Sequence, residues 1–303
     1  MIRAFHSDGY SVRLPEGHPF PIEKYGLVLR RLVDGGILRA EWLQEAEPVD
    51  PRLLALVHQP EYLERLFRGE MGREELRRLG LPWSKEMVLR ASASVGATIE
   101  AAWAALEAED GIGVGVNLGG GTHHAFPDRG EAFCIFNDIT IAIRLLQQRK
   151  ALKRSVIIDL DVHQGDGTAA ILRYDPDIFI LDIYCEENFP SRKVRTDIGL
   201  GLPEGTGDEE YLKQLKKHLP KALEFGPDLA FYQAGVDPLE EDSLGGLALS
   251  HEGLLERDRL VLQACREAGV PVVITLGGGY ARPITETVRA HLNTIVVARE
   301  LFT

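Results

Sequence analysis

The chain has 303 residues, of which 45% are hydrophobic, and it carries a formal net charge of −12 at pH 7 with a pI near 5.3. One large α/β domain or two average domains fit this length, and the acidic balance argues against a general nucleic-acid binder, which usually presents a basic face. The three cysteines, Cys134, Cys185 and Cys265, form no CxxC pair, so we expect neither a disulfide framework nor a thiolate zinc site. The sequence shows no signal peptide and no run of roughly 18 apolar residues, so we expect a cytoplasmic protein without a membrane span.

The first third of the chain is predicted to contain more helix than strand. After a short opening strand, helices are expected over residues 22–34 and 52–68. Residues 68–83 are rich in charge and glycine, which predicts a surface excursion, and a long alanine-rich helix is expected near 86–108.

From residue 112 onward, predicted strands and helices alternate. Such alternation indicates right-handed βαβ units and a mostly parallel sheet with helices on both faces, which is an α/β fold. Pro, Gly and Ser are scattered and form no connector, so we expect residues 1–303 to form a single domain. The strands are expected at 112–117, 155–162, 177–183, 228–233 and 271–276, and the helices at 138–149, 167–173, 208–224, 251–268 and 283–300.

The predicted strand over 155–162 runs into three ionisable residues, in the sequence SVIIDLDVHQGDG. Because side chains alternate between the faces of a strand, Asp159, Asp161 and His163 are predicted to share one face. Burial of unpaired carboxylates is costly, so a positive charge is expected beside them. We favour a bound cation; the alternative is a buried hydrogen-bond network without metal.

Three further segments place polar residues at predicted strand ends, where α/β sheets bind their ligands. GIGVGVNLGGGTHHAF presents His123 and His124, DLAFYQAGVDPLEED presents Asp237, and PVVITLGGGYA presents Tyr280. Each residue also has an ordinary structural interpretation. The two histidines could lie in a surface loop, Asp237 could be a turn residue before proline, and Tyr280 could be a core residue with a hydrogen-bonded hydroxyl. Their coincidence at strand ends predicts one common site.

A metal site can be assembled from these residues. Asp161, His163 and Asp237 would supply two carboxylates and one imidazole and would leave a position for water. An open set of three ligands suits catalytic zinc, although a single nitrogen ligand would also allow Fe²⁺, Co²⁺ or Mn²⁺. Asp159 and Asp166 are then left over and are suited to orient histidines around the metal.

Taken together, these motifs resemble the zinc-dependent histone deacetylases and their bacterial relatives. The resemblance rests on GGGTHH, FCIFND, IIDLDVHQGDG, AGVDPLEEDSLGG and LGGGY, which follow the family's order, with weaker similarity at HQPEYLERL and through the last helix. Within these motifs, the exact residues of IIDLDVHQGDG, ILDIY and VDPLEEDSLGG are most similar to the class IV branch of the family. The resemblance implies a single-domain arginase/deacetylase fold, with a central, mostly parallel sheet of about eight strands covered by helices on both faces.

The resemblance also implies an activity, the hydrolysis of acylated lysine at a zinc centre. It makes Asp161, His163 and Asp237 the expected zinc ligands, with one zinc ion per chain. Acetyl-lysine in a protein or peptide, lysine with a longer fatty acyl chain, and small acylated amines such as acetylpolyamines could all serve as substrates. The class IV resemblance favours acyl-lysine, including longer acyl chains.

Catalytic roles follow from the same resemblance. His124 corresponds to the histidine that takes a proton from the attacking water, and His123 corresponds to its electrostatic partner. The sequence leaves open which of them acts as base and which as acid. Asp166 resembles the residue that orients His124, Asp159 resembles the one that orients His123, and Tyr280 matches the tyrosine that polarises the substrate carbonyl.

The resemblance further implies a narrow substrate tunnel. Phe133 matches one aromatic wall, Phe189 is expected to supply the other, and Leu244 lies where the rim is expected. Gly278 is also expected to line the tunnel. Ala132 stands where the family commonly has glycine, which bears on the shape of the loop before Phe133.

A structural potassium ion is the second cofactor that the resemblance implies. In the family it lies beside the zinc and is held by backbone carbonyls around the positions of Asp159, Asp161 and His163. A side chain at the position of Asp182 also holds it, and Ile183 is assigned to the same site. Many relatives have serine in place of Asp182, whereas the class IV branch has aspartate.

Three alternatives differ in what they require. Nucleotide binding would need a GxGxxG register or a GK[ST] ending, and the glycine-rich segments supply neither. An arginase-type ureohydrolase would need two further carboxylates to hold two manganese ions, but Gly165 and Gly235 occupy those positions. A catalytically silent acyl-lysine reader would be expected to have lost at least one of His123, His124 and Tyr280, and all three are present.

The polyamine alternative would favour acidic residues around the tunnel entrance. Glu186, Glu187, Glu240, Glu241 and Asp242 could fulfil that requirement, although charge runs of this kind are usually solvated loops. The partners that we expect are therefore an acylated lysine or a small acylated amine, without direct contact to nucleic acid. The sequence does not indicate an oligomeric state.

Overall fold

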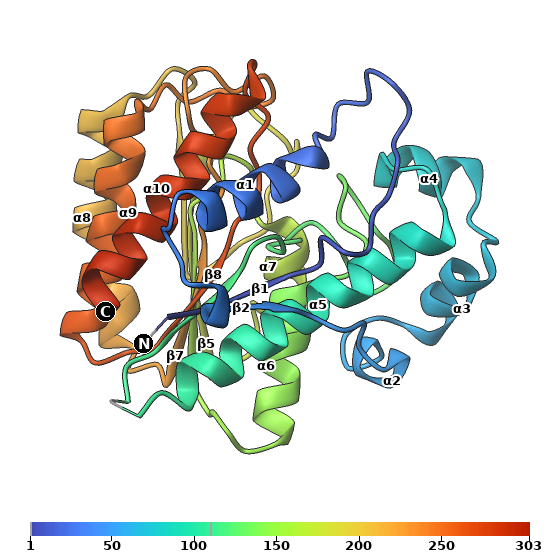
Figure 1. Cartoon of the computed structure of the whole chain (residues 1–303), viewed down its shortest axis with the longest axis horizontal. Helices are drawn as coiled ribbons and strands as arrows, with labels where there is room; N and C mark the ends of the chain where they lie inside the picture. Colours follow the sequence, from blue (N-terminus) through green and yellow to red (C-terminus); the bar gives the residue numbers. More distant parts are fainter. Residues whose placement is uncertain (1, 110) are drawn as a thin grey trace.

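The computed structural model describes residues 2–109 and 111–303 and contains one eight-stranded sheet in the order β2-β1-β3-β8-β7-β4-β5-β6. Figure 1 shows the sheet in the middle of the molecule with helices around it. Every pair of neighbouring strands is parallel, as the alternation of strands and helices predicts. The strands are β1 Ile2–His6, β2 Leu43–Glu45, β3 Val114–Asn117, β4 Ser155–Asp159, β5 Ile178–Cys185, β6 Ile198–Leu202, β7 Leu229–Gln233 and β8 Val272–Thr275.

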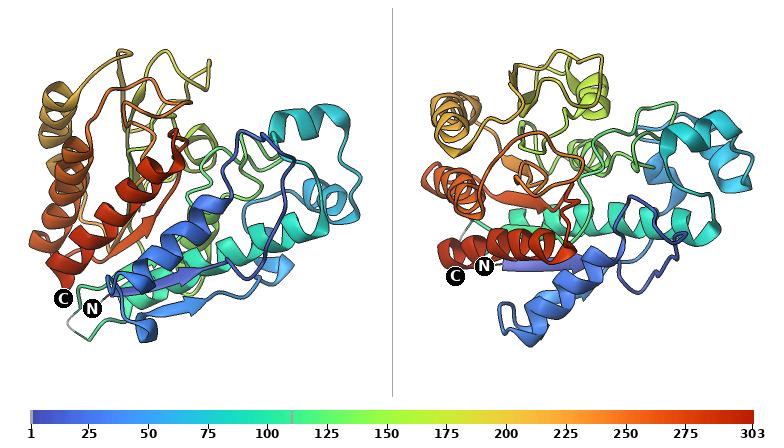
Figure 2. Two further views of the ribbon diagram at one scale, coloured as in Figure 1. Left: turned by 45° about the horizontal axis from the view of Figure 1, so that its top comes forward. Right: turned by 90° about the horizontal axis from the view of Figure 1, so that it is seen from above.

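Helices cover both faces of the sheet, which buries it in the way that parallel sheets require (Figure 2). One layer contains α1, α8, α9 and α10, and α5 and α6 form the other. The helices are α1 Glu23–Asp34, α2 Pro51–Leu54, α3 Pro60–Arg68, α4 Arg73–Leu79, α5 Lys85–Leu106, α6 Asp138–Gln148, α7 Asp166–Leu172, α8 Asp208–Glu224, α9 His251–Glu267 and α10 Ile284–Phe302, with a 3₁₀ turn η1 at Ala40–Trp42. Among the described residues, no helix is sufficiently long and apolar for a membrane crossing.

Strand β4 shows how a continuous apolar run fills two cores at once. Val156 and Ile158 belong to the core beneath α8, α9 and α10, whereas Ile157 between them belongs to the core beneath α5 and α6. This alternation is the period of two expected for a strand that is buried on both faces. The predicted strand over 155–162 is too long, because the ladder ends at Asp159 and the chain then turns into the loop that carries Asp161 and His163.

The predicted helix over 52–68 is wrong, because the chain breaks between α2 and α3. Pro60 disfavours helical backbone at the residue before it, and Gln59 is extended with φ −67° and ψ 141°. His58 lies buried in the break, where Nε2 accepts a hydrogen bond from the Asn137 backbone N–H at 3.0 Å and Nδ1 lies 3.0 Å from the carbonyl oxygen of Phe126. The break therefore ties this region to the loop that leads into α6.

Two short strands and one short helix are absent from the predicted elements. Strands β2 and β6 form the two edges of the sheet, where β2 has only three residues and β6 contains two glycines, so their sequences carry little strand signal. The predicted surface excursion over 68–83 contains α4, which begins where the carboxylate of Glu75 accepts the Gly72 N–H at 2.8 Å.

A buried ion pair supports the loops that follow β4 and β7. Arg257 of α9 is completely buried, and its guanidinium donates to both the Leu160 carbonyl at 3.2 Å and the Gly235 carbonyl at 2.6 Å. Its Nε and Nη2 donate to Oδ1 of Asp258 at 2.9 and 2.8 Å, and the hydroxyl of Thr294 donates to the other carboxylate oxygen at 2.6 Å. The pair thus joins α9 and α10 to the edge of the sheet that carries the candidate site.

Arg257→Leu should lower the free energy of unfolding by about 3–5 kcal/mol, because it leaves the Asp258 carboxylate buried without its cation. Urea unfolding followed by circular dichroism measures the change. Arg259→Leu is the matched control on the same helix, because Arg259 forms an exposed pair with Glu300 at 3.3 Å and should change stability by less than about 1 kcal/mol. Equal, small effects of the two substitutions would contradict the supporting role of Arg257.

Candidate metal centre

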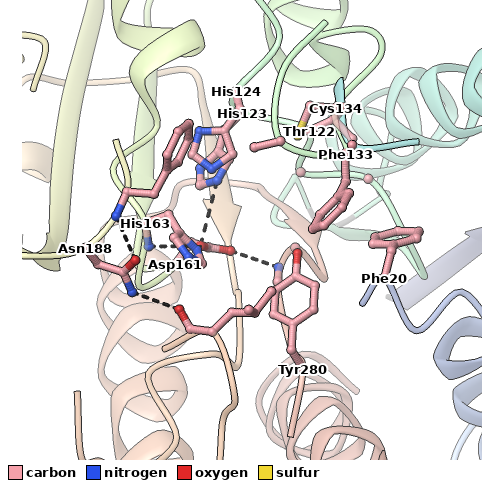
Figure 3. A pocket seen from close by; sticks show the side chains of 18 of the residues that line it. Phe20, Thr122, His123, His124, Phe133, Cys134, Asp161, His163, Asn188 and Tyr280 are labelled. Atoms are coloured by element: carbon pink, nitrogen blue, oxygen red, sulfur yellow. Dashed lines mark hydrogen bonds and ion pairs between the residues drawn. The ribbon is translucent and has the colours of Figure 1, made fainter. Parts of the chain in front are cut away.

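A cavity of about 380 Å³ lies at the carboxyl ends of the strands (Figure 3). Loops that follow β3, β4, β5, β7 and β8 contribute to its wall, because the carboxyl ends of parallel strands meet at one edge of the sheet. The sequence-predicted residues that line it are His123, His124, Phe133, Asp161, His163, Phe189, Leu244, Gly278 and Tyr280.

Asp161, His163 and Asp237 converge, although the last is distant from the other two in sequence. One ligand atom from each lies within 4.8 Å of the others. Nδ1 of His163 is 3.1 Å from Oδ1 of Asp161 and 3.2 Å from Oδ2 of Asp237. Backbone amides engage other oxygens of the two carboxylates: Gly278 N donates to Oδ2 of Asp161 at 2.8 Å, and Val162 N donates to Oδ1 of Asp237 at 2.9 Å.

These three residues fit a divalent cation. Oδ2 of Asp237 is buried and has no hydrogen-bond partner among the described residues, and it faces the imidazole of His163. Burial and the nearby charge of Asp161 raise the pKa of Asp237 to about 6. Burial lowers the pKa of His163, but the two carboxylates outweigh burial and raise it to about 10, because they stabilise a positive charge at this position. The same carboxylates would also stabilise the positive charge of a bound metal ion.

Two buried histidines lie beside the metal ligands, and each is held by its own aspartate. Nδ1 of His123 is 2.8 Å from Oδ2 of Asp159, and Nδ1 of His124 is 2.7 Å from Oδ1 of Asp166. The two imidazole rings are 4.1 Å apart between their centroids, and Nε2 of His123 lies 3.8 Å from Oδ1 of Asp161. Both rings are thus fixed in orientation, with Nε2 as the nitrogen left for other interactions.

The two histidines differ in their electrostatic surroundings. Burial lowers the pKa of His123, but Asp159 and Asp161 outweigh it and raise the pKa to about 10. Burial and the neighbouring charge of His123 lower the pKa of His124 to about 4. Adjacent imidazoles of similar burial therefore favour different protonation states. Asp159, Asp161 and Asp182 act on His123, whereas His124 has only the carboxylate of Asp166 and is repelled by the charge of His123.

Tyr280 lines the cavity from the segment after β8. Its side chain is half-buried, and this partial burial together with the nearby carboxylates Asp237 and Asp161 raises its pKa well above the usual value, so it stays a hydrogen-bond donor. The backbone N–H of Tyr280 donates to Oδ2 of Asp242 at 2.5 Å, while Oδ1 of Asp242 accepts the Leu244 N–H at 2.9 Å. Asp242 belongs to a charge run that is typical of a solvated loop, so its sequence context does not predict this role.

Lys24 is a buried charge that was not among the predicted site residues. Its side chain is completely buried, and Nζ donates to the carbonyl oxygens of Gly277 at 2.9 Å and Gly279 at 3.3 Å. The ammonium also lies 5.1 Å from the centre of the Tyr280 ring, and burial lowers its pKa to about 8. The helical repeat could have predicted this burial, because Lys24 lies four residues before Val28 and therefore on the same buried face of α1.

Aromatic rings form two walls of the cavity. Phe189 packs edge-on against His124 with ring centroids 5.0 Å apart, and the ring of Phe133 lies 6.1 Å from that of Tyr280 and 5.2 Å from that of Phe20. Ala132 and Phe133 both have left-handed backbone, with φ of 45° and 67°. Alanine thus adopts the conformation that glycine would take more readily at this loop.

The predicted potassium-site residues lie around a second group of buried carboxylates. Asp182 and Asp159 are register partners on β5 and β4, and Ile183 follows Asp182 on the same strand. Oδ2 of Asp182 accepts the Gly165 N–H at 3.1 Å, whereas Oδ1 is buried without a hydrogen-bond partner among the described residues. Burial and Asp159 raise the pKa of Asp182 well above its usual value, so these carboxylates also fit a cation.

The geometry gives little room for a second set of metal-binding carboxylates. A Cβ atom at Gly165 would lie 2.5 Å from Oδ2 of Asp159, and one at Gly235 would lie 2.3 Å from Oδ2 of Asp161. Both distances are shorter than side-chain contacts allow. The carboxylates of Asp159 and Asp161 therefore occupy the space that side chains at Gly165 and Gly235 would need in a binuclear ureohydrolase site.

The acidic residues considered for the tunnel entrance do not form it. The described residues that line the cavity include no member of this group, and the carboxylate of Asp242 is engaged by backbone amides. The group consists of Glu186, Glu187, Glu240, Glu241 and Asp242. An acidic entrance for a polyamine is therefore not observed in the cavity wall.

Comparison with known proteins places these features in context. The family model for the histone deacetylase domain matches residues 18–295. An uncharacterized protein of Picosynechococcus sp. is 45% identical over 299 residues, which cover 98% of this chain and 98% of the relative. Histone deacetylase 2 of Arabidopsis thaliana is 34% identical over 275 residues, which cover 88% of this chain and 70% of the relative. The solved structure of an HDAC homolog from Aquifex aeolicus has a TM-score of 0.85 at 27% identity, over 98% of this chain and 84% of that chain.

Asp237→Ala should reduce metal affinity by more than about 100-fold, because loss of a ligand costs more than the 10- to 100-fold loss typical of residues that only orient ligands. Elemental analysis after dialysis, together with competition against a chelating dye, measures affinity. Glu241→Ala is the matched control, because Glu241 is exposed on the same loop and should bind metal normally. Full metal occupancy in Asp237→Ala would remove Asp237 from the ligand set.

Proposed function

The chain belongs to the histone deacetylase family, and from that premise we propose that it is a zinc-dependent hydrolase that removes acyl groups from lysine side chains. The family relation itself makes the chain a deacetylase-type hydrolase. Zinc, the lysine substrate and an acyl group that is either acetyl or a longer fatty acyl are the proposed refinements. The observation that carries them is that Asp161, His163, the two oriented histidines and Tyr280 line one cavity, with Asp237 buried next to the imidazole of His163.

The residues proposed to hold zinc are Asp161, His163 and Asp237, with Fe²⁺ or Co²⁺ as possible substitutes. When bound, zinc would polarise the amide carbonyl and lower the pKa of water, which is the chemistry that amide hydrolysis needs. With only one imidazole and two carboxylates as protein ligands, a zinc ion would keep positions free for the water molecule and the amide carbonyl oxygen. Cys134, the thiol that also lines the cavity, is buried, and burial raises its pKa well above the usual value, so it stays a neutral thiol.

Proton transfer is assigned to His124. Its Nδ1 is occupied by Asp166, which fixes the ring and leaves Nε2 to accept the proton of the attacking water. The same nitrogen can then return the proton to the amine nitrogen of lysine as the C–N bond breaks. His123, held by Asp159 at Nδ1, stabilises negative charge near the reacting carbonyl. The products are a carboxylate and the free lysine amine.

Tyr280 is assigned the role of carbonyl donor. The O–H of a neutral phenol can donate a hydrogen bond to the carbonyl oxygen, and this hydrogen bond strengthens as negative charge develops on that oxygen. Phe133 and Phe189 would enclose the aliphatic chain of lysine, with Leu244 at the rim and Gly278 in the wall. Apolar walls suit this part of the substrate because they bury its methylene groups and exclude water.

A structural potassium ion is proposed beside the zinc. The unpartnered oxygen of Asp182, the adjacent Asp159 and the backbone around Asp161 and His163 supply the oxygen ligands that a hard cation prefers. Ile183 would contribute to the same site through its backbone. The ion would offset negative charge that the sheet edge would otherwise bury.

Tyr280→Phe should retain bound metal and reduce kcat by about 10²- to 10³-fold, because it removes a hydrogen-bond donor to the developing oxyanion and no ligand. Steady-state kinetics and elemental analysis of the same preparation provide the two readouts. Tyr174→Phe serves as control, because Tyr174 is 84% exposed. If Tyr280→Phe turned over at the normal rate, the assigned role of Tyr280 would be wrong.

The decisive assay for the proposed substrate uses one peptide whose lysine carries an acetyl, octanoyl or myristoyl group. We expect chelator-sensitive hydrolysis with one zinc ion per chain, and the chain-length profile then identifies the preferred acyl group. Hydrolysis of acetylspermidine but of none of the peptides would favour the small-amine alternative. Acyl-lysine binding without any hydrolysis would favour a silent reader, and two bound manganese ions would favour a ureohydrolase.

A further inference from the structure

We propose that Arg77 and Arg78 form a carboxylate-recognition site at the entrance of the cavity, so that the enzyme prefers acyl-lysines flanked by aspartate or glutamate. The inference rests on the proposed function and adds the class of sequence that surrounds the acylated lysine. Both arginines belong to the last turn of α4 and both line the cavity.

The end of α4 is attached to the cavity wall, which fixes where the two arginines lie. The carbonyl oxygen of Arg78 accepts the Ala132 N–H at 3.1 Å, and that of Leu79 accepts the Phe133 N–H at 2.7 Å. Gly80 packs so closely on Phe133 that a Cβ atom there would lie 2.9 Å from the ring. The arginine pair is therefore held next to the aromatic wall of the tunnel.

Both guanidinium groups are available to a substrate. The side chain of Arg77 is 83% exposed, and its contact with Glu74 is a long one of 4.0 Å. Arg78 is exposed, and its charge helps to lower the pKa of Glu75, but no hydrogen bond or ion pair holds its side chain within residues 2–109 and 111–303. The neighbouring carboxylate of Glu75 is already engaged by Arg65 at 2.8 Å and by the Gly72 N–H.

The carboxylates nearest to the two arginines are those of Glu74 and Glu75, and neither of them lines the cavity. Among the described residues that line the cavity, the only carboxylate is that of Asp161, which belongs to the metal site. The chain as a whole has a net charge of −12, so a general attraction for anions is not expected. A local positive entrance on an acidic protein favours a substrate with negative charge beside the lysine, and it disfavours polyamines and basic peptides.

Arginine suits this role because its planar guanidinium can bind both oxygens of a carboxylate. The site is exposed, so its effect should be moderate and sensitive to salt. Because the arginines lie at the entrance and not at the reacting carbonyl, the selectivity should appear in KM and leave kcat unchanged.

The test compares three peptides with the same acyl-lysine flanked by Glu, Gln or Lys. For the wild-type protein we expect kcat/KM for the Glu peptide to exceed that for the Lys peptide by about 10-fold in 50 mM NaCl, and the ratio to shrink in 500 mM NaCl. R77E/R78E should reverse this order. R73E is the matched control on the same helix, because Arg73 is exposed and does not line the cavity, and it should keep the wild-type order.

Equal rates on all three peptides, or the same order in wild type and R77E/R78E, would overturn the proposal. Activity on the Gln peptide reports the proposed function separately from charge selection. If no peptide is hydrolysed, the proposed function fails, and fluorescence anisotropy with labelled Glu and Lys peptides still decides the present inference. Tighter wild-type binding of the Glu peptide that R77E/R78E abolishes would support the carboxylate site, and equal binding of both peptides would reject it.

Discussion

Burial of several carboxylates at one edge of a parallel sheet is the constraint on which the rest of this structure depends. Asp159, Asp161, Asp182 and Asp237 are each at most 2% exposed. Removing such charges from water is costly unless cations and hydrogen bonds compensate them. Histidine rings and backbone amides supply part of that compensation, and the proposed zinc and potassium ions would supply the rest, so the groups that stabilise the fold also assemble the site.

The loops that carry these carboxylates need close backbone contacts, and this explains the glycine-rich segments better than nucleotide binding does. The Gly278 N–H donates to Asp161, and a Cβ atom at Gly278 would lie 1.8 Å from Oδ2 of Asp237. On the opposite side of the same loops, Arg257 donates to the carbonyls of Leu160 and Gly235. Amide donors thus face the acidic site, and carbonyl acceptors face the buried cation.

The segment that carries Tyr280 is held in a similar way. Lys24 donates to carbonyls of the preceding glycines, while Asp242 accepts the Tyr280 N–H. A phenol that must donate to a developing oxyanion needs such fixed backbone, because small displacements weaken the hydrogen bond when it matters most. The cavity therefore combines a rigid polar floor, aromatic walls and an entrance where Arg77 brings positive charge.

Hydrophobic periodicity and the order of the motifs can be read along the chain, so the α/β class, the central strands and the residues at their carboxyl ends could be predicted from the sequence. The break before Pro60 is also a local effect of proline, whereas the short edge strands β2 and β6 and the contacts of Lys24, Asp242 and Arg77 depend on the folded chain. Lysine, aspartate and arginine read locally as surface residues. Their burial or placement depends on partners that are distant in sequence. Lys24, for example, donates to the carbonyl of Gly277, which lies 253 residues further along the chain, and no local pattern specifies such a contact.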